Sequence, residues 1–360
     1  MQGCLAHPRV GGYDDESSGL QGGWAVEYRI LGSTGLRVSR LCFGTMSFGD
    51  VADEATSEAM YRRCRDVGIN FVDCANVYSA GRAEEILGRL IGGERDRIVL
   101  TTKVGFPMGK GVNDRGLSRR HILTSIEASL KRLNTDRIDI LFAHTFDPDT
   151  PMEETLRAFD RLVRQGKVLH FGASNWAAWQ IAKALGMAAL HDLPAFACVQ
   201  PMYNLAKRQA EVEILPLVAS ERLGAITYSP LGGGLLTGRY GVGVRPDRGR
   251  LVENEMYRTR YGAESNYRTA ERFVAYAKEQ GVHPVTLAVA WVARHPAVTA
   301  PIVGARNVEQ LEPSLAAADL TMDDETYAEL SALTPGPPPA TDRAEERAGL
   351  SYRGSEEMYK

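Results

Sequence analysis

The sequence predicts a closed (β/α)8 barrel of the TIM type, and three observations lead to it. Eight short apolar runs recur between residues 41 and 303, and seven of them are followed by a longer stretch with helical spacing. No hairpin signal separates these units, so neighbouring strands are expected to run parallel, joined by helical crossovers. Eight units over about 300 residues fit a single barrel, whereas the alternative, an open doubly wound sheet, usually has fewer strands.

We expect the barrel strands at residues 41–43, 71–73, 98–103, 138–143, 169–173, 197–200, 225–228 and 298–303. Residues 28–38, with Gly32 and Gly35 in the middle, are typical of a hairpin placed before the barrel. A helix is expected over 152–165, because Asp149, Thr150 and Pro151 form a cap signal and Gly166 follows its end. We expect three parts: an N-terminal tail (1–27), the barrel (28–334) and an irregular C-terminal tail (335–360).

Composition excludes several classes of protein. The hydrophobic fraction is 44% and the net charge is only −3, as in a soluble folded protein. With 42 basic against 45 acidic residues, no positive excess is present to bind nucleic acid. The five cysteines include no C-x-x-C pair, so neither a disulfide framework nor a metal site is expected. No apolar run is long enough to span a membrane, and we expect a cytoplasmic protein whose oligomeric state the sequence does not indicate.

Four polar side chains fall at or just after the ends of three neighbouring predicted strands. Asp73 ends the second strand, Tyr78 follows five residues later, Lys103 ends the third strand, and His144 follows the fourth. Each alone has an ordinary structural explanation, such as a turn former or a surface aromatic. Because the active site of a β/α barrel lies at the carboxyl ends of its strands, all four are expected at one rim.

Several sequence strings resemble the aldo-keto reductase superfamily. They are FVDCANVY (71–78), LTTK (100–103), HTFDPDTP (144–151) and FGASN (171–175). The likeness runs from about Tyr28 to Leu333. It implies a (β/α)8 barrel that binds NADPH without a G-x-G-x-x-G fingerprint, which this sequence lacks. It also implies a catalytic tetrad of Asp73, Tyr78, Lys103 and His144 that reduces an aldehyde or ketone.

The chemistry of carbonyl reduction fits these residue types. Hydride delivery to a carbonyl carbon leaves negative charge on the oxygen, which must be protonated as it forms. A phenol with a pKa of about 10 is a weak acid near neutrality, so a cation beside it helps by stabilising the phenolate. Lys103 can supply that cation, Asp73 its counter-ion, and His144 a hydrogen bond that orients the carbonyl. Tyr78 is then the expected proton donor.

The resemblance also implies cofactor contacts. Gly44, Thr45, Met46 and Asp73 lie at the first two strand ends; Ser174, Asn175 and Gln200 would bind the nicotinamide carboxamide, and Tyr228 would stack on the ring. The loop contacts expected for the pyrophosphate are Ser229, Pro230, Leu231, Gly233, Leu235, Gly238 and Arg239. Gly304 precedes a helix start, Arg306 suits a 2′-phosphate and favours NADPH over NADH, and Gln310 matches an adenine contact. Ser314 stands where the family usually has Asn.

The substrate pocket is expected to be apolar. Met46, Phe48, Phe106 and Phe146 follow strand ends and could form its wall around Tyr78 and His144. Phe146 stands where relatives often carry Trp. No motif in residues 241–266 or after Pro335 indicates the substrate.

Two other functions remain open at this point. The same resemblance includes potassium-channel β subunits, so a cofactor-sensing regulatory subunit is an alternative to the reductase. A ketoreductase of a sugar or secondary-metabolite pathway is the other. The complete tetrad fits all three.

Overall fold

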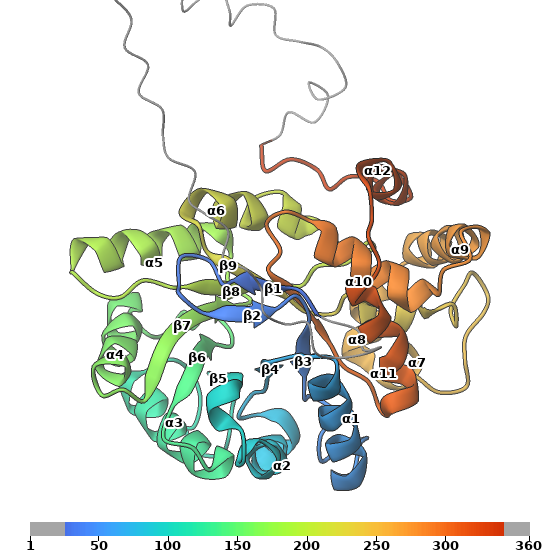
Figure 1. Cartoon of the computed structure of the whole chain (residues 1–360). Helices are drawn as coiled ribbons and strands as arrows, with labels where there is room; N and C mark the ends of the chain where they lie inside the picture. The colour runs from blue at the N-terminus through green and yellow to red at the C-terminus, as the bar shows by residue number, and fades with distance from the viewer. Residues whose placement is uncertain (1–25, 342–360) are drawn as a thin grey trace, which may run out of the picture.

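The computed structural model describes residues 26–341, and within them eight parallel strands close into a barrel surrounded by helices (Figure 1). The strands follow the circular order β10-β3-β4-β5-β6-β7-β8-β9, so each one pairs with its neighbour in sequence and the last closes on the first. The predicted (β/α)8 barrel is therefore confirmed. Much of the two predicted tails, 1–25 and 342–360, lies outside the described residues.

The barrel strands lie close to their predicted positions. They are β3 (Cys42–Gly44), β4 (Phe71–Asp73), β5 (Val99–Val104), β6 (Ile138–Ala143), β7 (Val168–Ser174), β8 (Cys198–Gln200), β9 (Gly224–Thr227) and β10 (Ala300–Val303). The largest shift is in β10, which begins two residues later than expected. The other strands differ by at most one residue at either end, so Tyr228 falls just after β9.

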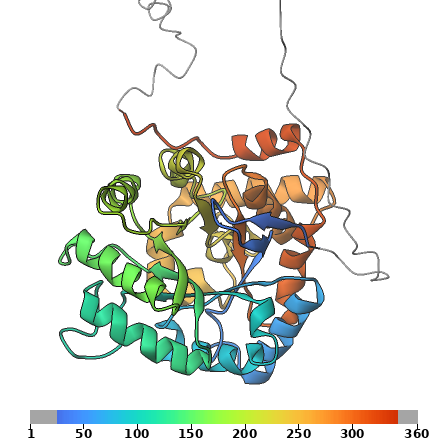
Figure 2. The same cartoon turned by 60° about the vertical axis from the view of Figure 1, so that its left-hand side comes forward.

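The helices form a layer outside the barrel, as both views show (Figures 1 and 2). They are α1 (Glu54–Asp66), α2 (Arg82–Ile91), α3 (Arg119–Leu133), α4 (Met152–Arg164), α5 (Ala178–Leu190), α6 (Ile214–Glu221), α9 (Glu264–Glu279), α10 (Pro284–Arg294), α11 (Val308–Leu315) and α12 (Asp324–Ala332). Local signals explain their ends: Ser118 caps the start of α3, and Asn134 ends it in a left-handed conformation. The cap expected before α4 differs, because Pro151 itself occupies the cap position without a side-chain hydrogen bond.

A hairpin closes the amino-terminal end of the barrel. Strands β1 (Tyr28–Ile30) and β2 (Arg37–Ser39) pair antiparallel, as predicted, and lie across that end (Figure 1). Leu31 and Val38 are fully buried in the same cluster as the apolar residues inside the barrel. Gly32 makes this approach possible: its φ is +54°, and a Cβ there would come within 2.5 Å of the Gly224 nitrogen.

The interior of the barrel changes character along its axis. Near the hairpin it is filled by apolar side chains, which include Cys42, Phe71, Val99, Ile140, Phe142, Cys198, Ile226 and Ala300. Side chains alternate along a strand, so residues two or four positions further on face the interior again. At the other end those residues are Asp73, Thr101, Lys103 and Gln200, all buried. The pleat thus places apolar packing at one end of the barrel and a polar cluster at the other.

The connection from β9 to α9 is the longest in the barrel. It contains the 3-10 turn η4 (Gly232–Thr237) and two short helices, α7 (Arg250–Glu253) and α8 (Glu255–Tyr261). Tyr257 of α8 packs on the turn, because a Cβ at Gly233 would lie 2.5 Å from its ring. Tyr257, from the 241–266 segment without a sequence motif, thus contacts the loop that carries the predicted pyrophosphate contacts.

Neither a metal-binding cluster nor a membrane-spanning helix is found among the described residues. Among the described residues, Cys42, Cys64, Cys74 and Cys198 are free and buried, and no group of His, Cys, Asp and Glu could hold a metal ion. In the same part of the chain, none of the helices combines the length and apolar character needed to cross a bilayer.

Candidate active site

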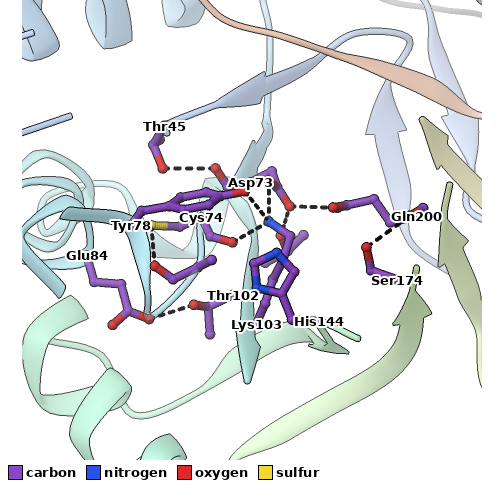
Figure 3. Close-up of polar contacts among 12 residues, drawn as sticks. Thr45, Asp73, Cys74, Tyr78, Glu84, Thr102, Lys103, His144, Ser174 and Gln200 are labelled. Atoms are coloured by element: carbon purple, nitrogen blue, oxygen red, sulfur yellow. Dashed lines mark hydrogen bonds and ion pairs between the residues drawn. The ribbon is translucent and has the colours of Figure 1, made fainter. Parts of the chain in front are cut away.

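Lys103 is the centre of a buried polar cluster at the carboxyl end of the barrel (Figure 3). Its Nζ donates to Asp73 Oδ2 at 2.6 Å and to the Cys74 carbonyl oxygen at 2.7 Å. The same atom lies 3.2 Å from Tyr78 Oη. Three of the four predicted tetrad residues are thus in direct contact, although they come from β4, the turn after it, and β5.

Asp73 is held by two further side chains. Its Oδ1 accepts hydrogen bonds from Thr101 Oγ1 at 2.7 Å and from Gln200 Nε2 at 2.9 Å. A buried carboxylate needs such partners because losing water is costly. Thr101 is the residue that sequence reasoning missed here. Strand alternation could have found it, because it lies two residues before Lys103 and so faces the same interior.

His144 completes the group from the end of β6. Its ring meets the Tyr78 ring edge-on at a centroid distance of 6.1 Å and the Phe106 ring at 4.5 Å. Burial and then the charge of Lys103 hold the pKa of His144 well below its usual value, so the imidazole is neutral at physiological pH. Its Nδ1 is buried and has no hydrogen-bond partner among the described residues.

Burial and neighbouring charges set the protonation states of Lys103 and Tyr78. Burial would lower the pKa of Lys103, but Asp73 and Tyr78 more than offset it, so the pKa is raised and the side chain stays charged. Burial raises the pKa of Tyr78 to about 12, against the opposing effect of Lys103. The phenol is therefore protonated at neutral pH, beside a permanent cation that stabilises its conjugate base.

Tyr78 begins a strained turn. The 3-10 element η1 (Tyr78–Gly81) contains Ser79 and Ala80 at φ of 48° and 53°, left-handed values that few residues other than glycine adopt. Gly81 follows at φ of 96°. Ser79 Oγ donates to the Phe48 carbonyl oxygen at 2.7 Å and ties the turn to the loop after β3. Strain of this kind concentrates at functional sites.

The predicted nicotinamide residues surround the next two strand ends. Asn175 Nδ2 donates to the His144 carbonyl oxygen at 2.8 Å, and Asn175 Oδ1 accepts from Tyr228 Oη at 2.8 Å. Ser174 Oγ donates to the Gln200 carbonyl oxygen at 3.0 Å. Among the described residues, no donor reaches Gln200 Oε1, which leaves an acceptor available beside Asp73.

The predicted cofactor contacts Gly44, Thr45 and Met46 lie at the end of β3 or just after it. Thr45 Oγ1 donates to the Asp73 carbonyl oxygen at 2.9 Å, which joins the ends of β3 and β4. Gly44 is buried, and a Cβ there would come within 2.6 Å of the Ile302 side chain. Met46 is 45% exposed.

The predicted phosphate-side residues come from the β9 loop and α11. Ser229 adopts a left-handed φ of 59°, and Asn204 Nδ2 donates to its carbonyl oxygen at 2.9 Å. The remaining predicted loop residues are Pro230, Leu231, Gly233, Leu235, Gly238 and Arg239; Leu235 is fully buried and Arg239 is exposed.

Gly304, Arg306 and Gln310 lie at the start of α11 or just before it, where Asn307 caps the helix by accepting from the Gln310 backbone N–H. Arg306 is half-buried and forms no ion pair with any described residue. An unneutralised guanidinium at a helix start fits a phosphate group. Ser314 is buried on α11.

The predicted pocket residues separate into two groups. Phe106 is 37% exposed beside His144, and Phe146 contacts the rings of Trp176 and Trp179, of which Trp179 is 62% exposed. Phe48 corrects the prediction: its ring packs on Phe43 and has no exposed surface, so it belongs to the core and offers nothing to a substrate. Trp179 is an exposed aromatic of this group that the sequence did not single out.

Comparison with known proteins gives the family. The family model described as Aldo/keto reductase family matches residues 40–335. The chain belongs to the aldo/keto reductase family. Among the relatives of this reductase-family chain, the uncharacterized oxidoreductase YrpG of Bacillus subtilis is 40% identical over 333 residues, covering 89% of this chain and 99% of its own.

Other relatives carry a different name. A probable voltage-gated potassium channel subunit beta of Arabidopsis thaliana is 40% identical over 302 residues, covering 82% of this chain and 92% of its own. A putative voltage-gated potassium channel subunit beta of Schizosaccharomyces pombe is 36% identical over 306 residues, covering 82% and 88%. This aldo/keto reductase family member is thus similar both to an uncharacterized oxidoreductase and to proteins named as probable or putative potassium channel subunits.

Proposed function

We propose that the protein is an NADPH-dependent reductase that converts an aldehyde or ketone to an alcohol, with Tyr78 as the proton donor. The observation that carries the proposal is the 3.2 Å contact between Tyr78 Oη and Lys103 Nζ, with Asp73 as the counter-ion of the lysine. This places a protonated phenol next to a fixed cation at the end of a barrel where substrates bind.

The residues of the chain have separate tasks in this reaction. Tyr78 donates its proton to the carbonyl oxygen as negative charge develops there, and Lys103 stabilises the phenolate that remains. Neutral His144 can donate a hydrogen bond to the same oxygen and orient it. Thr101 and Gln200 hold Asp73, which in turn holds the lysine.

NADPH, when bound, supplies the hydride for this reaction. Its carboxamide would be held by Ser174, Asn175 and Gln200, and the free acceptor on Gln200 is consistent with that fit. Arg306, without an ion pair among the described residues, would bind the 2′-phosphate, which is the basis for expecting NADPH rather than NADH. The half-exposed rings of Phe106 and Phe146 would form the apolar wall of the substrate site. We place the protein in the cytoplasm on the sequence argument alone.

The test is oxidation of NADPH by an aromatic aldehyde or a quinone, with NADH as the cofactor control. We expect Tyr78→Phe to lower kcat by about 10²–10⁴-fold, the usual contribution of a general acid. NADPH binding, followed by quenching of protein fluorescence, should be unchanged because the phenol is not a predicted cofactor anchor. A Tyr78→Phe variant that turns over as fast as the wild type would contradict the assignment of Tyr78 as the proton donor.

The relatives named as potassium-channel subunits favour a second candidate, a cofactor-sensing subunit of a membrane complex. The same tetrad would then catalyse a slow reaction while the chain is bound to a partner protein. Purification from its native source under mild conditions separates the two candidates. A stoichiometric membrane partner together with very slow NADPH oxidation would favour the subunit, and rapid turnover by the isolated chain would favour the reductase.

A further inference from the structure

A buried ion pair lies just outside the barrel wall, behind the tetrad. Glu84 of α2 has no exposed surface, and its Oε2 accepts from Arg132 Nε of α3 at 2.7 Å. Its Oε1 accepts from Thr102 Oγ1 of β5 at 2.5 Å (Figure 3). Burying a carboxylate is costly, and such pairs often contribute little net stability. The cost suggests that this pair does more than hold the fold together.

Thr102 connects the pair to the strand that carries Lys103. Successive side chains of a strand point to opposite faces, so Lys103 faces the barrel interior and Thr102 faces the helices. Both residues are fully buried. The hydrogen bond from Thr102 to Glu84 therefore fixes the position of α2 along β5 at the level of the lysine.

The same helix begins at the turn that carries Tyr78. The turn η1 runs from Tyr78 to Gly81, and α2 starts at the next residue. The Arg132 side chain lies directly against this junction, because a Cβ at Gly81 would come within 2.8 Å of Arg132 Cδ and 2.9 Å of its Nε. Arg132 thus contacts the turn and Glu84 at the same time.

The turn needs such support more than the lysine does. Its two non-glycine residues in the left-handed region, Ser79 and Ala80, bring Cβ close to the following carbonyl oxygen and are strained. Lys103 has two other strong hydrogen-bond acceptors, Asp73 and the Cys74 carbonyl. The phenol of Tyr78, in contrast, has Lys103 as its one hydrogen-bond partner within the described residues. A loosened turn would therefore move the phenol away from a lysine that stays in place.

We propose that Thr102, Glu84 and Arg132 are positioning residues that hold the Tyr78 turn against β5 and thereby set the distance between Tyr78 Oη and Lys103 Nζ. The catalytic meaning of this distance rests on the proposed function, in which Tyr78 transfers the proton. At an effective dielectric constant of about 20, a retreat of about 1 Å weakens the attraction enough to raise the pKa of Tyr78 by about one. The other groups that face Tyr78 are Asp73, Cys74 and His144, and none of them touches Thr102 or Arg132 through a hydrogen bond within the described residues.

The first experiment compares Thr102→Val with Thr102→Ser. Valine keeps the shape and removes the donor to Glu84, whereas serine keeps the hydroxyl. In alcohol oxidation with NADP+, Tyr78 must be ionised, so a pKa raised by about one lowers the rate at a fixed pH about tenfold and displaces the pH profile upward. We expect this in Thr102→Val, recovery in Thr102→Ser, and an unchanged dissociation constant for NADP+ in both.

Thr155→Val is the matched control. Thr155 is also buried, and its Oγ1 donates one hydrogen bond, to the Leu117 carbonyl oxygen at 3.0 Å, which joins α4 to the loop before α3 and involves neither α2 nor β5. Its loss should lower stability by a similar amount and leave the pH profile unchanged. A displaced profile in Thr155→Val, or an unchanged one in Thr102→Val, would overturn the positioning role.

Crystal structures of wild type and Thr102→Val test the same point without turnover. We expect the Tyr78 Oη to Lys103 Nζ distance to exceed hydrogen-bonding range in the variant and to be kept in Thr102→Ser. An unchanged distance in Thr102→Val contradicts the proposal, even if the wild type proves inactive on every carbonyl tested. Inactivity of the wild type with a lengthened distance in the variant would instead contradict the proposed function alone.

A double variant tests the ion pair without leaving one buried charge unpaired. Removing one charge of the pair would leave the other buried and unpaired, so Glu84→Gln and Arg132→Met are combined in one chain. The double variant should fold and show the same displaced profile as Thr102→Val, because the contacts at Gly81 and Thr102 are both weakened. A folded double variant with the wild-type profile and distance would overturn the proposal.

Discussion

The two ends of the barrel interior are built from the same strands and differ completely in chemistry. On β5, Val99 belongs to the apolar cluster under the hairpin, whereas Thr101 and Lys103 belong to the polar cluster at the opposite end. On β6, Ile140 and Phe142 are apolar and His144 follows them at the rim. Along one strand, an apolar side chain of the core and a polar side chain of the site are thus only two or four residues apart.

This difference shows how the fold supports a costly site. The apolar end excludes water and is covered by Leu31 and Val38, so its burial stabilises the barrel. The polar end buries an ammonium and a carboxylate, which is unfavourable unless every partner is present. Changes at the two ends should therefore separate stability from chemistry, and the following predictions test that separation from the largest expected effect to the smallest.

Lys103→Met should have the largest effect, on both stability and activity. It leaves Asp73 buried without its cation, and breaking a buried ion pair costs about 3–5 kcal/mol. Reduction of a carbonyl should become undetectable, because the phenolate loses its stabilising charge. Urea unfolding measures the first effect and NADPH oxidation the second. The double variant Lys103→Met with Asp73→Asn should be more stable than the single one, and equal or lower stability would contradict the unpaired-charge explanation.

Ile140→Ala tests the apolar end. The side chain is fully buried, and large-to-small substitutions in such cores cost about 2–5 kcal/mol. The pH dependence of turnover should stay as in wild type, since the substituted side chain is confined to the layer beneath the site. Urea unfolding and the pH profile give the two readouts. A displaced profile would mean that the two ends of the barrel are not independent.

The comparison also explains what the sequence could and could not predict. The alternation of apolar runs and helical stretches predicts the barrel, and strand ends place Asp73, Lys103 and His144 at one rim, because both signals are local. Thr101 follows from the same alternation once Lys103 is placed inside. The Glu84–Arg132 pair does not follow from a local signal, because the two residues are 48 positions apart in sequence and their contact depends on the close approach of Arg132 to Gly81. Phe48 was misplaced because an apolar residue after a strand can face either the core or the site.

Thr101→Val should have a smaller effect at the polar end. It removes one hydrogen bond to the Asp73 carboxylate and keeps the shape of the side chain. Hydrogen bonds to charged groups contribute about 1.5–3 kcal/mol, so the unfolding free energy should fall within that range. Val99→Ala on the same face of β5 is the control, since it lowers stability without touching Asp73. If Thr101→Val left stability unchanged, Asp73 would not depend on this partner.

His144 predicts a pH dependence of stability with a definite sign. Burial and Lys103 lower its pKa well below the value of about 6.5 expected in the unfolded chain. As pH falls below that value, the unfolded state binds a proton that the folded state does not, so the free energy of unfolding decreases, by at most about 1.4 kcal/mol per pH unit. Above that range His144 is neutral in both states and contributes no slope. Because burial also lowers the pKa of His121, His170 and His295, the measurement is the difference between wild type and His144→Asn in urea unfolding across this range. Wild type should lose stability more steeply on acidification, and parallel curves would show that His144 gains a proton as readily in the folded barrel as in the unfolded chain.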